Sequence, residues 1–419
     1  MQLFESNKRI AIIYPWPGLG TFQPLLDASR LLVQNGFQVE IFTVNHPNFP
    51  PPPQANHPGI SVITNRCDLF REEGVISPKW LFGRGGRLNH CFITKIYRPI
   101  WRNWLISDFR RHHKSLPYKC IIGMNRFGDG LFEAAFIANK INVPLINWSL
   151  ELQFRAELKT KKQRRLKQKE IENSQKASFT IIQDQWRGQA LAQENKLALT
   201  KMIFVPVARM GIARRKSNNS FRERLGISSE LRVILCAGGI GWHNMNLEII
   251  EAANRLPDNY IFIMQSAYRR YSTFDYQNMV INKANPNRVK VLFEPVPSED
   301  YRALVDSADV GVAFYRACSP MSANTYMKGL DIIGLSSGKL ADYLFSGLPV
   351  VVNKVTGPLD LVNSFNCGKS VNDAMEMEDA LESIFQKYEY YSDNACRCFN
   401  ERLELGRHFQ SVIEKISSL

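Results

Sequence analysis

The sequence lacks the features that would place it in a membrane, fibrous or disordered class. No uncharged apolar run approaches the ~18 residues that a membrane-spanning helix requires. The apolar run Ile10–Tyr14 is too short for a signal peptide and leads into the turn Pro15-Trp16-Pro17-Gly18. No short internal repeat is visible, and 45% hydrophobic with 22% charged residues is typical of a globular protein. We therefore expect a protein of two or three domains with no integral membrane segment.

Metal-ligating patterns are missing as well. The eight cysteines form no Cys-x-x-Cys pair, and the seven histidines show no zinc-ligand spacing. A chain of 419 residues can be stabilised by its core alone, so reduced thiols in a cytoplasm fit better than a disulfide framework. We expect no bound metal and a cytoplasmic location.

Positive charge is present in excess, and it is concentrated. The net charge is +14, with ten Lys or Arg and one acid in residues 76–119, and nine Lys or Arg and three acids in residues 152–177. These two basic segments account for the whole excess of positive charge, so the charge belongs to two parts of the surface and is not spread over all of it.

The hydrophobic pattern predicts two α/β halves. In the first half, buried strands are expected at Lys8–Tyr14, Val39–Val44, Tyr118–Gly123, Val143–Trp148, Phe179–Gln183 and Met202–Val207. Helices are expected between them, at Phe22–Asn35, Gly130–Lys140, Gln185–Glu194 and as one long helix from Leu152 to about Lys176. Alternating strands and helices indicate a parallel sheet.

The same alternation returns after a polar, basic linker. We assign residues 1–207 to the first domain, 208–225 to the linker, 226–393 to the second domain and 394–419 to a C-terminal helix that could cross back to the first domain. The second-domain strands are expected at Arg232–Ala237, Tyr260–Gln265, Val289–Phe293, Val310–Phe314 and Pro349–Asn353. In such doubly wound sheets, ligands bind at the carboxyl ends of the strands.

The densest candidate site is Gly334-Leu335-Ser336-Ser337-Gly338-Lys339-Leu340-Ala341-Asp342. A small-residue turn opens a helix there, and free N–H groups at a helix N-terminus suit a diphosphate. Lys339 opposes the helix dipole, and a bound anion would relieve that conflict. Asp342 lies on the same helix face and could accept hydrogen bonds from ribose hydroxyls. The alternative is an ordinary helix cap with an exposed Lys339–Asp342 ion pair.

This stretch resembles the nucleotide-binding signature of GT-B glycosyltransferases, close to the family 4-like group. Further matches follow in the right order at Gln183–Arg187, Phe221–Ile227, Phe293–Tyr301 and Ala308–Val312. The resemblance implies two Rossmann-like domains that face a central cleft. It also implies a nucleotide-sugar donor as co-substrate, UDP-linked by preference, and no tightly bound cofactor.

The resemblance also implies roles for individual residues. Asp342 would hold the ribose, and Lys339 with the backbone of Ser336, Ser337, Gly338 and Leu340 would hold the diphosphate. The loop Glu294–Pro297 would flank the base, with contacts at Glu294 and Val296. No Asp-x-Asp pair occurs, so the diphosphate would be neutralised without metal, with Arg316 as a further candidate cation.

Two departures from the family pattern concern the donor. Many family 4 enzymes carry a Glu eight residues before the ribose-binding acid, and that position is Gly334 here. The usual Arg and Lys at the start of the second domain are replaced by a loop with Gly238, Gly239 and Gly241, which also contains His243. Its amides could approach a phosphate, although a tight turn is the alternative reading of the glycines.

The first domain offers candidates for the acceptor side. Gly18, Gly20 and Thr21 follow the first strand. Asn125 and Arg126 are candidate substrate-binding residues after a later strand, and Asp129 is the best-placed base for an acceptor hydroxyl. Asp129 could instead cap a helix that starts at Gly130. Glu151, at the end of another strand, is a second catalytic candidate or a partner of a neighbouring cation.

The basic segments suggest a membrane surface. Seven aromatic residues between Trp80 and Phe109 are interleaved with the cations of 76–119, and rings with cations suit an anionic lipid interface. One alternative is that the aromatic side chains lie in the core and the charges form a solvated face. Binding of nucleic acid is a weaker alternative, because the basic segments contain no known nucleic-acid-binding motif.

Together these patterns predict a GT-B glycosyltransferase that moves a sugar to a hydroxyl of a lipid-linked or polysaccharide acceptor. Retention of configuration is favoured by the resemblance. We expect a peripheral protein on the cytoplasmic face of the membrane, acting in cell-envelope or exopolysaccharide synthesis. A sugar-nucleotide epimerase on the same fold and a catalytically degenerate partner protein remain alternatives.

Overall fold

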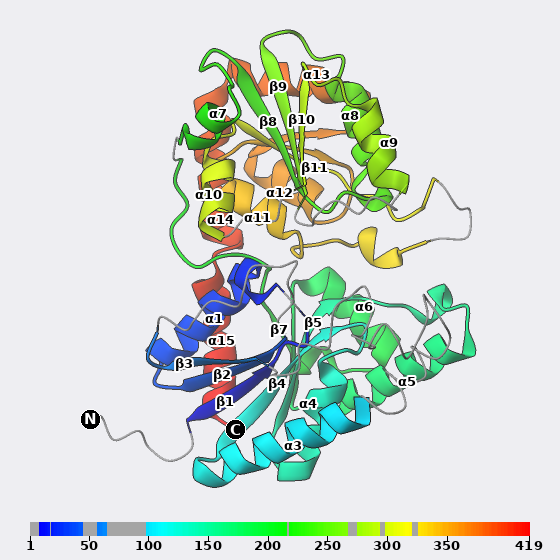
Figure 1. Cartoon of the computed structure of the whole chain (residues 1–419), viewed down its shortest axis with the longest axis vertical. Helices are drawn as coiled ribbons and strands as arrows, with labels where there is room; N and C mark the ends of the chain where they lie inside the picture. The colour runs from blue at the N-terminus through cyan, green and yellow to red at the C-terminus, as the bar shows by residue number, and fades with distance from the viewer. Residues whose placement is uncertain are drawn as a thin grey trace, which may run out of the picture.

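Two parallel sheets, each covered by helices on both faces, form the protein (Figure 1). The computed structural model describes residues 8–16, 18–44, 57–64, 98–215, 218–266, 275–293, 298–320 and 326–419. The prediction of two doubly wound α/β units is confirmed. We call the half built on the first sheet the N-terminal unit and the other half the C-terminal unit.

The N-terminal unit has seven strands in the order β3-β2-β1-β4-β5-β6-β7. Its strands are β1 (Arg9–Ile13), β2 (Gln38–Thr43), β3 (Ile60–Thr64), β4 (Tyr118–Arg126), β5 (Leu145–Glu151), β6 (Phe179–Ile182) and β7 (Met202–Phe204). Its α-helices are α1 (Gln23–Gln34), α3 (Arg98–Ser115), α4 (Leu131–Ile141), α5 (Lys161–Lys176) and α6 (Gln185–Asn195), with short 3-10 turns η1 (Leu19–Thr21), η3 (Arg155–Glu157) and η4 (Leu199–Lys201).

The C-terminal unit has six strands in the order β10-β9-β8-β11-β12-β13. The strands are β8 (Arg232–Gly238), β9 (Tyr260–Ser266), β10 (Val289–Leu292), β11 (Val310–Ala313), β12 (Val350–Asn353) and β13 (Gly368–Val371). The α-helices are α7 (Ser220–Arg224), α8 (Asn246–Ala253), α9 (Asp275–Lys283), α10 (Ser298–Asp306), α11 (Gly338–Phe345), α12 (Pro358–Phe365), α13 (Met377–Gln386) and α14 (Tyr388–Arg402), with η5 (Trp242–Asn244), η6 (Lys328–Leu330) and η7 (Ala374–Glu376).

The chain returns to the N-terminal unit at its end. Helix α15 (Leu405–Ser417) packs against α1, and Phe409 lies 5.7 Å from Trp148 of β5 between ring centroids. The side chains of Leu405, Phe409 and Val412 are fully buried in the core that α1 shares with β1. This apolar face, repeated every three to four residues, is what fixes α15 on the first sheet.

The first part of the linker is held by hydrogen bonds at the start of this returning helix. Asp27 of α1 accepts from the Met210 amide at 3.1 Å, and Glu404 accepts from the Gly211 amide at 3.0 Å. Asn400 of α14 accepts from the Ala213 amide at 2.8 Å. Because these acceptors come from both ends of the chain, the linker is anchored to α1 and to the α14–α15 junction.

Two predicted helices are wrong in extent. The expected helix from Leu152 to Lys176 begins only at Lys161, because Thr160 caps α5 by accepting from the Gln163 amide at 3.1 Å. The expected C-terminal helix over residues 394–419 is divided between α14 and α15. Glu404 makes the break by capping α15, with its carboxylate 2.8 Å from the Arg407 amide.

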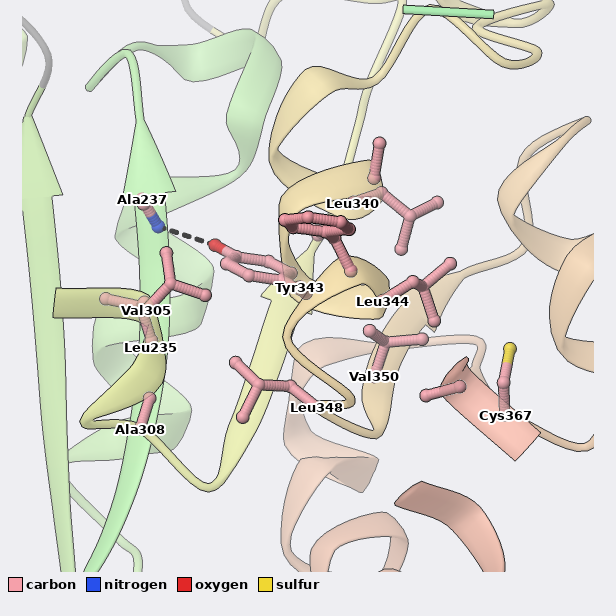
Figure 2. Close-up of a cluster of buried hydrophobic side chains, with 14 of the residues drawn as sticks. Leu235, Ala237, Val305, Ala308, Leu340, Tyr343, Leu344, Leu348, Val350 and Cys367 are labelled. Carbon is pink, nitrogen blue, oxygen red and sulfur yellow. Dashed lines mark hydrogen bonds between the residues drawn. The ribbon is translucent and has the colours of Figure 1, made fainter. Parts of the chain in front are cut away.

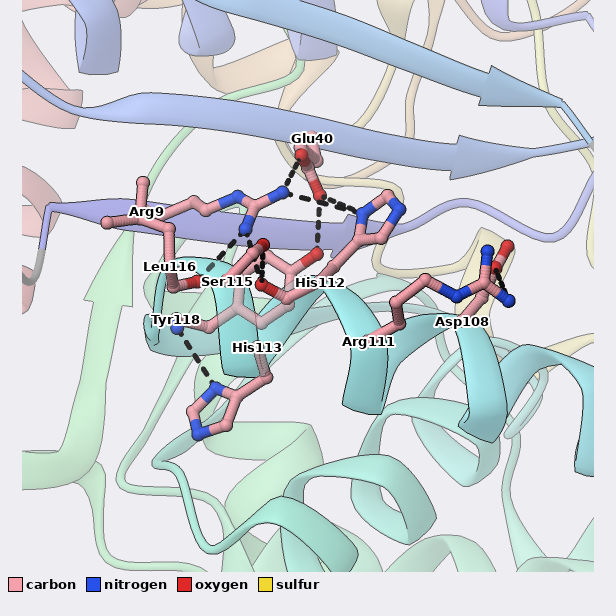
Figure 3. A network of polar contacts seen from close by, with 9 residues as sticks. All are labelled: Arg9, Glu40, Asp108, Arg111, His112, His113, Ser115, Leu116 and Tyr118. Carbon is pink, nitrogen blue, oxygen red and sulfur yellow. Dashed lines mark hydrogen bonds and ion pairs between the residues drawn. The ribbon is translucent and has the colours of Figure 1, made fainter.

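A buried ionic cluster closes the amino-terminal edge of the first sheet (Figure 3). Glu40 of β2 pairs with Arg9 of β1 and accepts a hydrogen bond from the Tyr118 hydroxyl. Arg9 also donates to the carbonyls of His112 and Leu116, at 2.8 and 2.9 Å, and so ties the end of α3 to the sheet. Burial alone would raise the pKa of Glu40, but the hydrogen bonds from Arg9 and Tyr118 outweigh that effect and lower the pKa overall.

Candidate functional site

Helix α11 begins with the small-residue turn singled out in the sequence. Ser337 is its N-cap, and the hydroxyl of Ser337 accepts from the Leu340 amide at 3.3 Å. The same hydroxyl contacts the Tyr315 hydroxyl, from the loop after β11. The Ser336 hydroxyl instead donates to the Ile333 carbonyl at 2.6 Å. The first turn of α11 is therefore fixed by its own side chains, while helix geometry leaves its leading N–H groups without partners inside the helix.

Lys339 of α11 faces the glycine loop that follows β8. Its ammonium lies 3.3 Å from the Asn244 side-chain oxygen and 4.7 Å from the centroid of the Tyr315 ring. A Cβ built on Gly238 would lie 3.7 Å from the Lys339 Cδ. Two segments about 100 residues apart in sequence, which we matched separately to a phosphate, thus meet at one place.

The glycine loop has a defined shape. Gly238 has φ +120°, a conformation that side chains rarely adopt, and the Gly241 amide donates to Asn246 at 2.8 Å. Asn244 donates to the Gly239 carbonyl at 2.7 Å, so one side chain contacts both the loop and Lys339. Burial, and then the charge of Lys339, lowers the pKa of His243, which favours its neutral form. The net effect is a partly buried cluster of backbone groups beside the positive charge of Lys339.

Asp342 lies one turn further along α11 and is held by the linker. The Nε of Arg209 donates to Oδ1 of Asp342 at 2.5 Å, with both side chains mostly buried. Burial lowers the pKa of Arg209, but the Asp342 carboxylate raises it further, so the guanidinium stays charged. The alternative interpretation, an exposed Lys339–Asp342 ion pair, does not match the structure, in which Asp342 pairs with Arg209 and Lys339 contacts Asn244.

Helix α11 is fixed against the sheet by Tyr343 (Figure 2). The Tyr343 oxygen accepts from the Ala237 amide at 2.8 Å, just before the glycine loop. Its ring covers β11 at Gly311, where a Cβ would lie only 2.3 Å from the ring. This close approach sets the helix N-terminus at the same level as the carboxyl end of β8.

Arg316 lies nearby but is already paired. Its guanidinium donates to Glu248 of α8 at 2.5 Å, and its backbone amide donates to the His243 carbonyl at 2.9 Å. Arg316 thus supports the glycine loop through its backbone. In this arrangement its positive charge is balanced by Glu248, whereas Lys339 faces the loop.

In the N-terminal unit, the acceptor candidates gather at the carboxyl ends of β4 and β5. Arg126 and Glu151 are register partners on neighbouring strands, and both are exposed. Asp129 is exposed as well, but it does not cap α4, because the cap is Gly130 and the helix starts at Leu131. The capping alternative for Asp129 is therefore wrong.

Asn125 is fully buried and acts within the fold. Its side-chain oxygen accepts from the Gly128 amide at 2.8 Å, and its amide nitrogen lies 3.5 Å from Glu170 of α5. Glu170 in turn pairs with Lys167 at 3.1 Å, and both side chains are 1% exposed. A buried ion pair thus supports the turn that carries Arg126 and Asp129, and Asn125 shapes that turn from beneath.

The turn after β1 is compact. Gly18 has φ +88° and is buried, and the Thr21 hydroxyl donates to the Gly18 carbonyl at 2.7 Å. Gly20 is half-buried and Thr21 is exposed. Glu294 and Val296, the expected base-flanking residues, lie outside the described residues. Within the described part of the chain, no group of three or more His, Cys, Asp or Glu is arranged to hold a metal ion.

Four residues that sequence reasoning did not single out complete the site. They are Asp184, Arg209, Asn244 and Tyr315. Their partners lie between 22 and 151 residues away in the sequence, and no local pattern marks such pairs. A basic linker was recognised, but nothing in it distinguished Arg209 from its neighbours.

Comparison with known proteins identifies the fold. No family model matches the chain, and no curated protein matches it in sequence. Solved structures do: HepE of Anabaena in complex with UDP-glucose has a TM-score of 0.64 at 15% identity and covers 98% of this chain and 100% of its own. A sucrose-phosphate synthase from Thermosynechococcus elongatus has a TM-score of 0.63 at 13% identity, with 98% of each chain covered.

A third structure is similar over the same length. WaaG, a glycosyltransferase involved in lipopolysaccharide biosynthesis, has a TM-score of 0.62 at 13% identity and covers 98% of this chain and 100% of its own. Coverage of nearly the whole chain in each case includes both sheets and the linker. The chain has the GT-B fold.

Proposed function

We propose that the protein is a glycosyltransferase that takes its sugar from a nucleotide-diphospho-sugar, with UDP as the favoured nucleotide. The observation that carries the proposal is the meeting of Lys339, the N-terminus of α11 and the Gly238–Gly241 loop. A lysine, helix amides and glycine backbone are the groups that bind a diphosphate in the absence of metal. The likeness to HepE, whose structure holds UDP-glucose, supports UDP.

The geometry suggests how these groups would promote transfer. Breaking the bond between the sugar and the diphosphate develops negative charge on the departing oxygen. Lys339 and the amides of the α11 turn are fixed before the reaction, so they would stabilise that charge without reorganising. Asp342 would accept hydrogen bonds from the ribose through Oδ2, because Oδ1 is bonded to Arg209. We propose transfer with retention, on the strength of the resemblance.

The acceptor side of the proposal rests on the N-terminal unit. Arg126, Asp129 and Glu151 are exposed at the carboxyl ends of β4 and β5, where Asp129 or Glu151 could take the proton of an acceptor hydroxyl. Helix α5 carries exposed cations along its length, including Lys161, Arg165 and Lys169. We propose a lipid-linked or glycan acceptor at an anionic membrane surface. Residues 76–97, half of the segment 76–119, lie outside the described residues, and none of the described helices combines the length and apolarity of a bilayer span.

The first test is a thermal-shift panel with UDP, GDP, ADP, CMP and dTDP on the wild type and on Lys339→Ala. A ligand at 100 times its Kd stabilises a protein by ~2.7 kcal/mol. We expect a shift with one nucleotide, strongest for UDP and lost in the variant. Absence of a shift with every nucleotide would refute the donor site.

Turnover separates the proposed enzyme from its alternatives. A glycosyltransferase releases UDP from a UDP-sugar in proportion to the acceptor added. An epimerase changes the sugar nucleotide with no acceptor present, and a degenerate partner protein binds UDP without turnover. The absence of an acid at position 334 favours the degenerate protein as the second candidate, so the assay should include UDP-glucose with a range of lipid and glycan acceptors.

A further inference from the structure

Position 334 shows why the expected acid is missing. Gly334 has φ +57°, and a Cβ built on it would lie 2.0 Å from Oδ2 of Asp184. The backbone of Gly357 also lies close to Gly334: a Cβ built on Gly357 would lie 2.4 Å from the Gly334 carbonyl oxygen. No side chain fits at position 334 unless its surroundings move. The space is taken by a carboxylate from the other unit of the protein.

Asp184 reaches position 334 from the end of β6. Its Oδ1 caps α6 by accepting from the Arg187 amide at 2.9 Å, and its Oδ2 accepts from the Leu335 amide at 2.7 Å. The residue is 4% exposed. Burial raises the pKa of Asp184 above its ordinary value, and the hydrogen bonds from the two amides and the Arg187 charge offset only part of that rise. One side chain thus serves a helix in the N-terminal unit and a turn in the C-terminal unit.

Two more hydrogen bonds hold the same turn from outside the C-terminal unit. The fully buried Arg187 donates to the Ile332 carbonyl at 3.3 Å. The Val207 amide, where β7 gives way to the linker, donates to the Leu335 carbonyl at 3.0 Å. The turn 332–335 is therefore bonded at three backbone atoms by residues of the N-terminal unit and its exit.

The turn leads directly into the N-terminus of α11. Ser336 is bonded back to the Ile333 carbonyl through both its amide, at 3.2 Å, and its hydroxyl, at 2.6 Å. Ser337 caps the helix and Lys339 lies in its first turn. A displacement of the turn would therefore carry with it the amides and the lysine that we assign to the diphosphate.

We infer that Asp184 is a positioning residue of the donor site, which holds the diphosphate-binding turn from across the boundary between the units. The inference rests on the proposed function. A site whose donors are fixed beforehand binds more tightly than one that must be ordered on binding. Asp184 does not touch the diphosphate in this scheme; it acts by fixing the Leu335 amide and, through it, the start of α11.

Serine at position 184 separates this role from simple stabilisation. Serine caps helices about as well as aspartate, so Asp184→Ser keeps the α6 cap but is too short to reach the Leu335 amide. The matched control is Asp373→Ser, since Asp373 caps the exposed turn η7 by accepting from the Met375 amide at 2.8 Å. Asp373→Ser should melt close to the wild type, and Asp184→Ser should melt lower only by the loss of one buried hydrogen bond and still fold.

Calorimetric titration with UDP and with uridine then measures the effect. We expect Asp184→Ser to weaken UDP binding about tenfold, the scale of one hydrogen bond to a charged group, and to leave uridine binding and the control variant unchanged. Equal losses for UDP and uridine, or no loss, would overturn the positioning role. If the wild type binds no UDP, the proposed function fails together with this inference, and that result is distinct from a neutral Asp184→Ser.

A double-mutant cycle tests the occupied space directly. Gly334→Ala should lower the melting temperature in the wild type, because its Cβ meets Oδ2 of Asp184. In an Asp184→Ala background the same change should cost less, since only the backbone strain at φ +57° remains. Equal costs in both backgrounds would show that Asp184 does not occupy the space at position 334.

Discussion

The Nε of Arg209 lies 2.5 Å from Oδ1 of Asp342, so a linker residue holds the acid that we assign to the ribose. The backbone of Arg209 is itself fixed, because its carbonyl accepts from the Leu405 amide at 3.1 Å. Asp342 is therefore oriented by a residue anchored to α15 rather than by its own helix. This arrangement assigns one carboxylate oxygen to Arg209 and leaves the other for a ligand.

The first prediction concerns this pair. Asp342→Ala should weaken UDP binding by about 1–3 kcal/mol, because the ribose loses a charged acceptor. The loss should vanish for 2′,3′-dideoxy-UDP, which lacks the hydroxyls. Arg209→Met should weaken UDP binding less, and the double variant should bind no worse than Asp342→Ala alone. Calorimetric titration with both ligands measures all four cases, and an Asp342→Ala loss of equal size with the dideoxy ligand would exclude the ribose role.

The second prediction concerns the buried pair Lys167–Glu170 beneath the acceptor turn. Lys167→Met leaves a buried, unpaired carboxylate and should lower the free energy of unfolding by about 3–5 kcal/mol. Adding Glu170→Gln removes that charge and keeps an oxygen for Asn125, so most of the loss should be recovered. Urea unfolding measures both variants. A double variant as unstable as the single one would mean that the pair does more than balance charge.

The fold could be predicted because its signals are local. Runs of β-branched residues such as Ile10–Ile13 alternate with amphipathic helices such as α1, and this alternation allows few arrangements other than parallel sheets. The start of α5 was also marked locally, since Thr160-Lys161-Lys162-Gln163 has the spacing of a capping box. The prediction followed the basic residues of the segment and not this capping box, so it placed the start of the helix at Leu152 and not at Lys161.

The site could be predicted only where it is continuous in sequence. The turn before α11 and the glycine loop each predict a phosphate-binding site, because glycines and free backbone amides next to each other in sequence are typical of such sites. The contacts of Asp184 with Leu335 and of Arg209 with Asp342 join residues 151 and 133 positions apart. From the sequence alone, Gly334 indicates only that the family's acid is absent at this position. The side chain that occupies the space, Asp184, belongs to the other unit, so no local pattern could predict it.

The third prediction concerns pH and the Arg9–Glu40–Tyr118 cluster. The pKa of Glu40 in the folded protein lies below its ordinary value of 4.5, so the folded state favours the charged form. Its contribution to stability is present above pH 4.5 and is lost as the pH falls through the lower folded value. Glu40→Gln should therefore lower the urea midpoint at pH 7 and flatten its fall below pH 4.5. The same slope in the variant as in the wild type would assign the acid sensitivity to other carboxylates.

The last prediction concerns the basic face of α5. Lys161, Arg165 and Lys169 are exposed and spaced by four residues, so they form one strip on the helix. Each cation near an anionic surface contributes ~1 kcal/mol, so the loss of two cations weakens binding to phosphatidylglycerol vesicles on the order of thirtyfold. Reversing Arg165 and Lys169 to Glu should weaken it by more than that, because two repulsive charges are added.

The control for this strip changes net charge equally at a different place. Lys354→Glu with Lys387→Glu alters two exposed lysines of the C-terminal unit. Vesicle sedimentation at rising salt should show binding that needs anionic lipid, falls with ionic strength, and is lost in the α5 variant but kept in the control. Equal losses in the two variants would show that net charge, and not this strip, governs attraction to the membrane. No binding by the wild type would remove the membrane from the proposed function and leave the donor site unaffected.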